Sequence, residues 1–191
     1  MDFNELCLGC RTYRRFEQKE IPEEILTELL ENARVANSAM NGQPLRYVLV
    51  KTSEAVRKIQ PCFHFAAALP KELGQPKEGE QPAAFIILCT EGRETPWTGI
   101  DIGIAVRTMN LNAYVYGIGS CIIGNVEFEK VKEILSIPET WIPRLALALG
   151  YPSHKSTIVE LPEDSSLKYY LDEERQYYVP KRKQEDISII R

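Results

Sequence analysis

The chain has 191 residues, of which 44% are apolar and 26% are charged, so it can bury a sizeable core and has the composition of a soluble globular protein. Its formal net charge of −4 argues against a general nucleic-acid-binding surface, and no apolar run approaches the length of a membrane span. Because residues 1–5 lack a signal-peptide pattern, we expect a cytoplasmic protein with five reduced cysteines and with neither nucleic acid nor membrane as a partner.

Residues 2–10 predict a short helix, because apolar residues and both cysteines of the segment recur at helical spacing. Cys7 and Cys10 form a C-x-x-C motif, which is compatible with a redox pair or with half of a metal site. Zinc would require a second cysteine pair or a histidine close by, and a thioredoxin-like site would require a preceding strand. The sequence offers neither, so we interpret the two thiols as core-facing or half-buried and predict no metal site.

The segment Arg11-Thr12-Tyr13-Arg14-Arg15-Phe16 places three arginines within five residues. A guanidinium group matches phosphate or carboxylate through two parallel hydrogen bonds, and Thr12 adds a hydroxyl. The segment is therefore a candidate anion-binding site. The alternative is a solvated basic turn that pairs with glutamates in the range 17–24.

A helix is predicted over residues 21–35, where Pro22 and two glutamates suit the first turn and an apolar stripe follows. The next segment, 37–46, reads as a tight turn and carries Asn41 and Gln43, whose amides both donate and accept hydrogen bonds. Such amides suit the edge of a flat heterocycle. The alternative is that they satisfy the backbone of a helix-to-strand loop.

The remainder predicts alternating helices and strands around an irregular segment at 61–82, with an exposed loop at 71–81. His64 is interpreted as a packed or surface histidine. The glycines of 117–124 lack the G-x-G-x-x-G order of a dinucleotide site, and we expect them to let backbone approach a flat ligand. Predicted strands cover 46–52, 83–90 and 144–150, with a strand-like run at 176–179. Predicted helices cover 53–59 (capped by Ser53), 98–116 (starting at Thr98 or Asp101) and 127–135.

Four blocks together resemble the nitroreductase family of FMN flavoproteins. Arg11-Thr12-x-Arg14-x-Phe16 is similar to that family's N-terminal Arg-Ser/Thr-x-Arg/Lys motif, and Ser38-Ala39-x-Asn41-x-Gln43-Pro44 is similar to its Ser-x-x-Asn-x-Gln-Pro loop. Gly117-Ile118-Gly119-Ser120-Cys121 resembles its Gly-Leu-Gly-Ser/Thr-Cys segment, and Leu147-Ala148-Leu149-Gly150-Tyr151-Pro152 resembles its last core strand. The blocks occur in the family's order and spacing over about residues 4–152.

The resemblance implies an α+β sandwich with a mainly antiparallel sheet flanked by helices. It also implies an obligate homodimer with FMN at the subunit interface. We expect residues 1–191 to form a single nitroreductase-like domain. Its C-terminal arm, about residues 153–191, is expected to reach the partner subunit.

The resemblance further implies which residues bind the flavin. Arg11 and Thr12 would hold phosphate or ribityl oxygens, and Arg14 would lie by the pyrimidine end, where a cation favours the reduced flavin. The loop at 37–46 would reach the same flavin from the other subunit. The implied cofactor-binding residues are Arg11, Thr12, Arg14, Ser38, Ala39, Met40, Asn41, Gln43, Ile122, Ile123, Gly124 and Arg182, with Lys155 as a weaker candidate.

The sequence departs from the family pattern at Cys10, where many members have a basic residue, so one phosphate contact is expected to be missing unless Arg15 or the tail supplies it. The tail carries a basic cluster at 180–183, which includes Arg182. That cluster is interpreted either as a phosphate contact or as a solvated charged tail.

The implied activity is that of an FMN-dependent NAD(P)H oxidoreductase. Hydride from NADH or NADPH would pass to the flavin and on to a nitroaromatic, a quinone or a similar small acceptor, by a ping-pong mechanism. No side chain is expected to be catalytic, because flavin N5 carries the chemistry. Loops 60–82 and 91–100 are expected to shape the acceptor pocket. Two alternatives stay open: a non-catalytic flavin-binding protein, and a family relative that uses FMN for another reaction.

Overall fold

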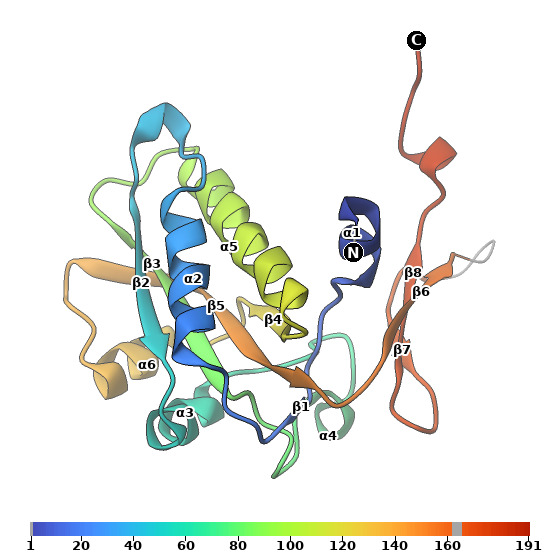
Figure 1. Cartoon of the computed structure of the whole chain (residues 1–191), viewed down its shortest axis with the longest axis horizontal. Coiled ribbons are helices and arrows are strands. Elements are labelled where there is room, and N and C mark those ends of the chain that lie inside the picture. Colours follow the sequence, from blue (N-terminus) through green and yellow to red (C-terminus); the bar gives the residue numbers. More distant parts are fainter. Residues whose placement is uncertain (1, 162–165) are drawn as a thin grey trace.

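A five-stranded antiparallel sheet forms the centre of the protein in the computed structural model, which describes residues 2–161 and 166–191 (Figure 1). Strands β3 and β5 pair along most of their length, and β2 pairs with the free edge of β3. On its other side β5 pairs with β4 and then, near its end, with β1. The bounds are β1 (Phe16–Glu17), β2 (Leu45–Val50), β3 (Ala84–Glu91), β4 (Gly119–Ile123) and β5 (Trp141–Pro152).

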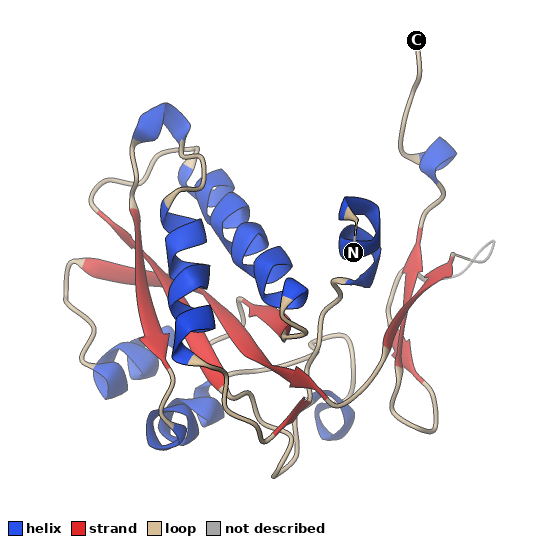
Figure 2. Ribbon diagram, viewed as in Figure 1, coloured by secondary structure: helices blue, strands red, loops and turns tan. Residues whose placement is uncertain are grey.

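Helices cover both faces of this sheet (Figure 2). Alternate residues of β3 belong to two different cores. Phe85 and Ile87 pack with α3 and α6, whereas Ile86 and Leu88 pack with α2 and α5. Burial on both faces explains why β3 is a continuous apolar run. The helices are α1 (Phe3–Gly9), α2 (Glu23–Arg34), α3 (Ser53–Ile59), α4 (Lys71–Gly74), α5 (Thr98–Val115) and α6 (Phe128–Leu135), with short 3₁₀ turns η1 (Ala39–Asn41), η2 (Gln60–Cys62) and η3 (Gln184–Asp186).

The predicted α+β class is confirmed, and the structure corrects several details. The cap of α3 is Thr52 rather than Ser53, because the Thr52 side chain accepts a hydrogen bond from the backbone N–H of Ala55. The segment at 71–81, predicted as a loop, begins with the helical turn α4. The glycine-rich segment forms β4, a strand that its sequence did not predict. Gly117 ends α5 as expected, with a φ of +71°.

The C-terminal arm forms its own small sheet, which the sequence predicted only at 176–179. In it β6 (Ser156–Glu160) pairs in parallel with β8 (Tyr177–Lys181), and β7 (Tyr170–Leu171) pairs with β8 in antiparallel orientation. The arm is also the part of the chain that holds residues 162–165, which lie outside the described ranges. Beyond β8 the chain leads away from the main sheet to its C-terminus (Figure 1).

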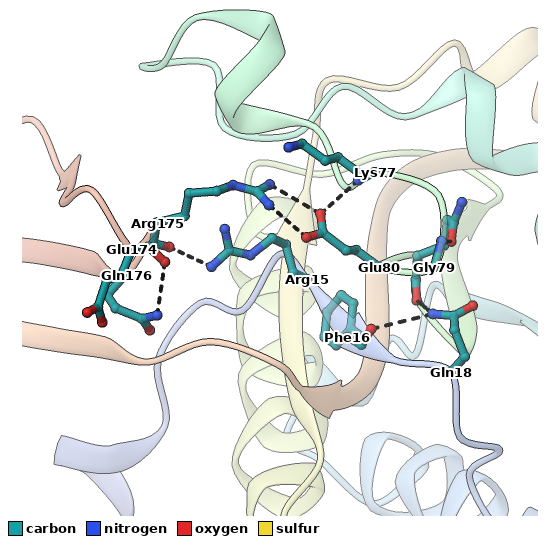
Figure 3. Close-up of polar contacts among 10 residues, drawn as sticks. Arg15, Phe16, Gln18, Lys77, Gly79, Glu80, Glu174, Arg175 and Gln176 are labelled. Atoms are coloured by element: carbon teal, nitrogen blue, oxygen red, sulfur yellow. Dashed lines mark hydrogen bonds and ion pairs between the residues drawn. The ribbon is translucent and has the colours of Figure 1, made fainter.

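An ionic cluster joins the arm to the body of its own chain (Figure 3). Arg15 is 5% exposed and donates a hydrogen bond from Nη2 to the carbonyl of Arg175 at 2.5 Å. Arg175 in turn donates to both carboxylate oxygens of Glu80, at 2.7 and 3.2 Å. Burial lowers the pKa of the Arg15 guanidinium from its usual range. The Arg15 side chain therefore binds the arm of its own chain.

Candidate functional site

The arginine-rich segment follows α1 and runs beside β4. Thr12 forms a parallel bridge with Ser120, and the backbone N–H of Tyr13 donates to the Ser120 carbonyl at 2.9 Å. This pairing depends on Gly119, because a Cβ there would lie 2.7 Å from Tyr13 Cδ2 and 2.6 Å from Pro152 Cγ. We expected the glycines of 117–124 to let backbone approach a flat ligand. At Gly119, however, the space is filled by the chain's own Tyr13 and Pro152.

Replacing Gly119 with Ala should therefore destabilise the fold and disturb the arginine-rich segment. The added methyl group would overlap the Tyr13 ring and Pro152, and overpacking of this kind costs about 1–3 kcal/mol. Urea unfolding of Gly119→Ala measures the loss. An unchanged unfolding midpoint would show that Tyr13 moves aside without cost.

A cavity of about 250 Å³ lies where the arginine-rich segment, α5, β4 and the arm meet. Arg11 donates from Nη2 to the carbonyl of Cys7 at 2.6 Å, which fixes its direction. The Nε of Arg11 and the Oγ of Ser156 are buried without a partner among the described residues. The lining residues are Cys10, Arg11, Thr12, Arg107, Asn110, Ser120, Ile122, Ser156, Val179 and Lys181.

The structure thus brings three predicted residues, Arg11, Thr12 and Ile122, to one cavity across more than a hundred residues of sequence. Both Lys181 and Arg182 of the tail are exposed, but only Lys181 lines the cavity. Sequence reasoning missed the contribution of α5 and, from the arm, chose Arg182 instead of its neighbour Lys181. One signal was present: Arg107 is the only charged side chain of α5 after Asp101.

Arg14 does not line this cavity, and its guanidinium lies against two tyrosines of the arm. Its guanidinium carbon is 4.5 Å from the ring centroid of Tyr169 and 4.8 Å from that of Tyr177, which is cation–π geometry. Its backbone N–H donates to Nε2 of His154 at 3.0 Å. No sequence pattern indicated these three aromatic partners. Lys155, the weaker phosphate candidate, is exposed and its carbonyl lies 2.9 Å from His154 Nδ1.

The loop at 37–46 is anchored to the first turn of α5 by Asp101, which is buried. Ser38 donates from Oγ to Asp101 Oδ2, and the backbone N–H of Ala39 donates to Oδ1, both at 2.9 Å. Gln43 donates from Nε2 to the side-chain oxygen of Asn41 at 3.0 Å.

Three residues of this loop have left-handed backbone conformations. Met40, Asn41 and Gln43 have φ values of +51°, +56° and +46°. Such conformations are costly for residues other than glycine and cluster at functional sites. The loop presents Met40, which is 92% exposed, to the surface of its own chain.

Replacing Asp101 with Ala should release this loop. The half-buried hydroxyl of Ser38 and the N–H of Ala39 would lose their acceptor, which should cost about 2 kcal/mol of unfolding free energy. Chemical denaturation measures the loss. The exposed carboxylate of Glu54 provides a control, since Glu54→Ala should change stability by less than about 0.5 kcal/mol. Equal effects of the two variants would contradict the anchoring role.

The segment 122–124 alternates about the sheet as a strand does. Ile122 is 43% exposed and lines the cavity, whereas Ile123 is buried in the core that contains Phe63. Gly124 is exposed, and a Cβ there would meet nothing closer than Leu145, at 3.8 Å. Of the three, the side chain of Ile122 is therefore available to a ligand.

The two groups of predicted flavin-binding residues do not meet within one chain. The loop at 37–46 is fastened at Asp101, whereas the cavity is lined by Asn110 of the same helix. At 1.5 Å per residue these two positions are about 14 Å apart along the helix axis.

Cys7, Cys10 and His64 agree with their sequence interpretation. Cys7 is half-buried and Cys10 is buried. His64 is partly exposed, with Nε2 3.5 Å from Glu127 Oε1. Within residues 2–161 and 166–191 there is no group of His, Cys, Asp or Glu side chains arranged to hold a metal ion. None of the helices described above combines the length and apolar character needed to cross a membrane.

Comparisons with known proteins were made for both sequence and structure. The family model described as "Nitroreductase family" matches residues 9–151. A protein of Methanothermobacter thermautotrophicus named "Putative NADH dehydrogenase/NAD(P)H nitroreductase" is 29% identical over 160 residues, which cover 80% of this chain and 78% of that protein.

Solved structures share the fold. The crystal structure of the nitroreductase family protein from Streptococcus pneumoniae TIGR4 has a TM-score of 0.68 and 21% identity, over 85% of this chain and 97% of that one. A structure described as an FMN-dependent nitroreductase from Clostridium difficile R20291 has a TM-score of 0.65 at the same identity and coverage.

Proposed function

The chain belongs to the nitroreductase family, and from this membership we propose that it is an FMN-dependent NAD(P)H oxidoreductase. We propose a nitroaromatic, a quinone or a similar small molecule as its electron acceptor. The name of the Methanothermobacter relative supports a nicotinamide donor, and the name of the Clostridium structure supports FMN. The observation that carries the proposal is the cationic cavity beside Arg11 and Thr12.

The residues at this cavity fit the phosphate end of FMN. A phosphate group offers acceptor oxygens, and Arg11 Nε and Ser156 Oγ are buried polar atoms without a partner in the described part of the chain. Ile122 adds exposed apolar surface next to them. When bound, FMN would supply the chemistry by taking two electrons from the nicotinamide and giving them to the acceptor.

The chain's own residues would bind, orient and tune the cofactor. Arg11 and Thr12 would hold the phosphate end, and Arg14 would place a positive charge near the ring system. Asn41 and Gln43 would reach the ring edge from a second subunit, where their amides can donate and accept. A thiol mechanism has little support, because burial raises the pKa values of Cys89 and Cys121 to about 11.

We propose that the active form is a homodimer. Helix α5 is apolar nearly all round, yet Ile100, Ile104 and Val115 are exposed on it. Their spacing puts them on one stripe of the helix, which is typical of a surface that packs against another copy. Such packing would also let the loop at 37–46 of one chain reach the cavity of its partner.

Steady-state kinetics test this proposal. Double-reciprocal plots for NADH or NADPH against a quinone or nitroaromatic should be parallel lines, because one site would serve both substrates in turn. Intersecting lines would contradict the ping-pong mechanism. Bound flavin that supports no turnover with any acceptor would favour the non-catalytic alternative instead.

A further inference from the structure

The same cavity contains one cation that the sequence analysis did not suggest, Arg107, and one from the basic cluster at 180–183, Lys181. Arg107 comes from the middle of α5, and Lys181 comes from β8 of the arm. Together with Arg11 they place three positive charges around a volume of about 250 Å³, and none of the described lining residues is acidic. Such a site attracts a compact dianion rather than a neutral molecule.

Hydroxyl groups complete the lining. Thr12, Ser120 and Ser156 contribute one each. The combination of guanidinium, ammonium and hydroxyl donors matches a tetrahedral oxyanion, whose oxygens accept several hydrogen bonds at once. A carboxylate has fewer acceptor oxygens and would leave part of this donor set unused. The lining therefore favours a phosphate monoester.

A buried polar network holds Arg107 in place. Its Nη1 donates to the side-chain oxygen of Asn110 and lies 3.5 Å from the Sγ of Cys10. Asn110 also accepts from the Cys10 thiol at 3.1 Å, and its Nδ2 donates to the hydroxyl of Ser120. Arg107 thus lies against the residue that precedes Arg11, where the chain itself carries no charge. Burial raises the pKa of the Cys10 thiol, so that residue stays neutral beside the guanidinium.

We propose that Arg107 is a phosphate-binding residue that completes the site begun by Arg11 and Thr12, beside Lys181 of the basic cluster at 180–183. The inference rests on the proposed function and names the group that the cavity recognises, the phosphate monoester of FMN. The 2′-phosphate of NADPH has the same chemistry, and the experiment separates the two sources. The arm then has a role in its own chain, since it supplies both Lys181 and Ser156.

The test compares FMN with riboflavin, which lacks the phosphate. The full-length apoprotein is titrated with each flavin and followed by quenching of flavin fluorescence. Arg107→Gln should weaken FMN binding about tenfold or more and leave riboflavin binding within about twofold, because only FMN loses a charge-assisted contact. Arg107→Lys should retain part of the preference. Lys181→Gln should act in the same direction, and because Lys181 is exposed it should fold normally.

Arg57→Gln is the matched control. Arg57 lies on α3, is exposed and lines no part of this cavity, so removing its charge should leave both affinities unchanged. Equal losses for FMN and riboflavin in Arg107→Gln would mean a purely structural role and overturn the proposal. So would an effect confined to the KM for NADPH, with KM for NADH and FMN binding unchanged.

The wild-type protein separates this inference from the proposed function. Equal affinity for FMN and riboflavin would overturn the phosphate site and leave a flavin enzyme standing. Failure to bind either flavin would remove the proposed function, and with it this assignment.

Discussion

Between pH 6.5 and pH 4 the protein should lose about 3 kcal/mol of unfolding free energy through one side chain, His154. His154 is 7% exposed, and burial lowers its pKa to about 4. The unfolded chain, in which histidine has its ordinary pKa, therefore binds more protons than the folded chain throughout this window. Stability is complete above the unfolded pKa and falls as the pH drops towards the folded one.

The loss of stability at low pH has a structural cause. Nε2 of His154 accepts the backbone N–H of Arg14, so the ring must be neutral with its proton on Nδ1, which lies 2.9 Å from the Lys155 carbonyl. Protonation of Nε2 would break the contact with Arg14. Flavin should then be released in the same pH range, because the arginine-rich segment would lose its support.

Denaturant unfolding at a series of pH values measures this effect. His154→Gln should flatten the profile between pH 6.5 and 4, since its amide does not titrate. His64 is the other histidine of the chain and lies on the surface, so His64→Gln should keep the acid loss. If wild type and His154→Gln lose stability in parallel, the buried histidine is not the cause.

Replacing Arg14 with Gln should slow reduction of the bound flavin about a hundredfold while changing FMN affinity much less. A unit positive charge placed about 5 Å from the flavin ring would stabilise a negative charge on that ring by about 3 kcal/mol, at an effective dielectric constant of about 20. That charge matters most when the flavin is reduced and carries extra negative charge. The two-electron midpoint potential should fall by about 60 mV.

The environment of Arg14 makes this prediction specific. The rings of Tyr169 and Tyr177 hold the guanidinium in one place, so its charge has a defined position relative to the cavity. Arg14→Lys should restore most of the potential, whereas Arg57→Gln should not change it. An unchanged potential in Arg14→Gln would remove Arg14 from the flavin site.

Much of the fold could be predicted from sequence because several elements carry their own signals. The uninterrupted apolar run of β3 and the glycine stop after α5 are local features, and both predictions are confirmed. β4 was not predicted, because a five-residue segment that begins with glycine becomes a strand only by pairing with β5. β6 and β7 were missed for the same reason, since both depend on β8.

The part of the candidate site that comes from one short sequence motif could be predicted. Arg11 and Thr12 are neighbours in the sequence, and they do line one cavity. The side chains that meet them come from α5 and from the arm, and no local pattern records such a meeting. His154 was overlooked because its role depends on burial against Tyr13 and Tyr177. The roles of these residues towards flavin remain predictions.

One measurement tests the central claim most directly. The visible spectrum of the purified protein, reconstituted with FMN if necessary, is recorded before and after anaerobic addition of NADH or NADPH. We predict protein-bound flavin absorption that bleaches with at least one of the two nicotinamides. A protein that binds no flavin even after reconstitution would contradict the account.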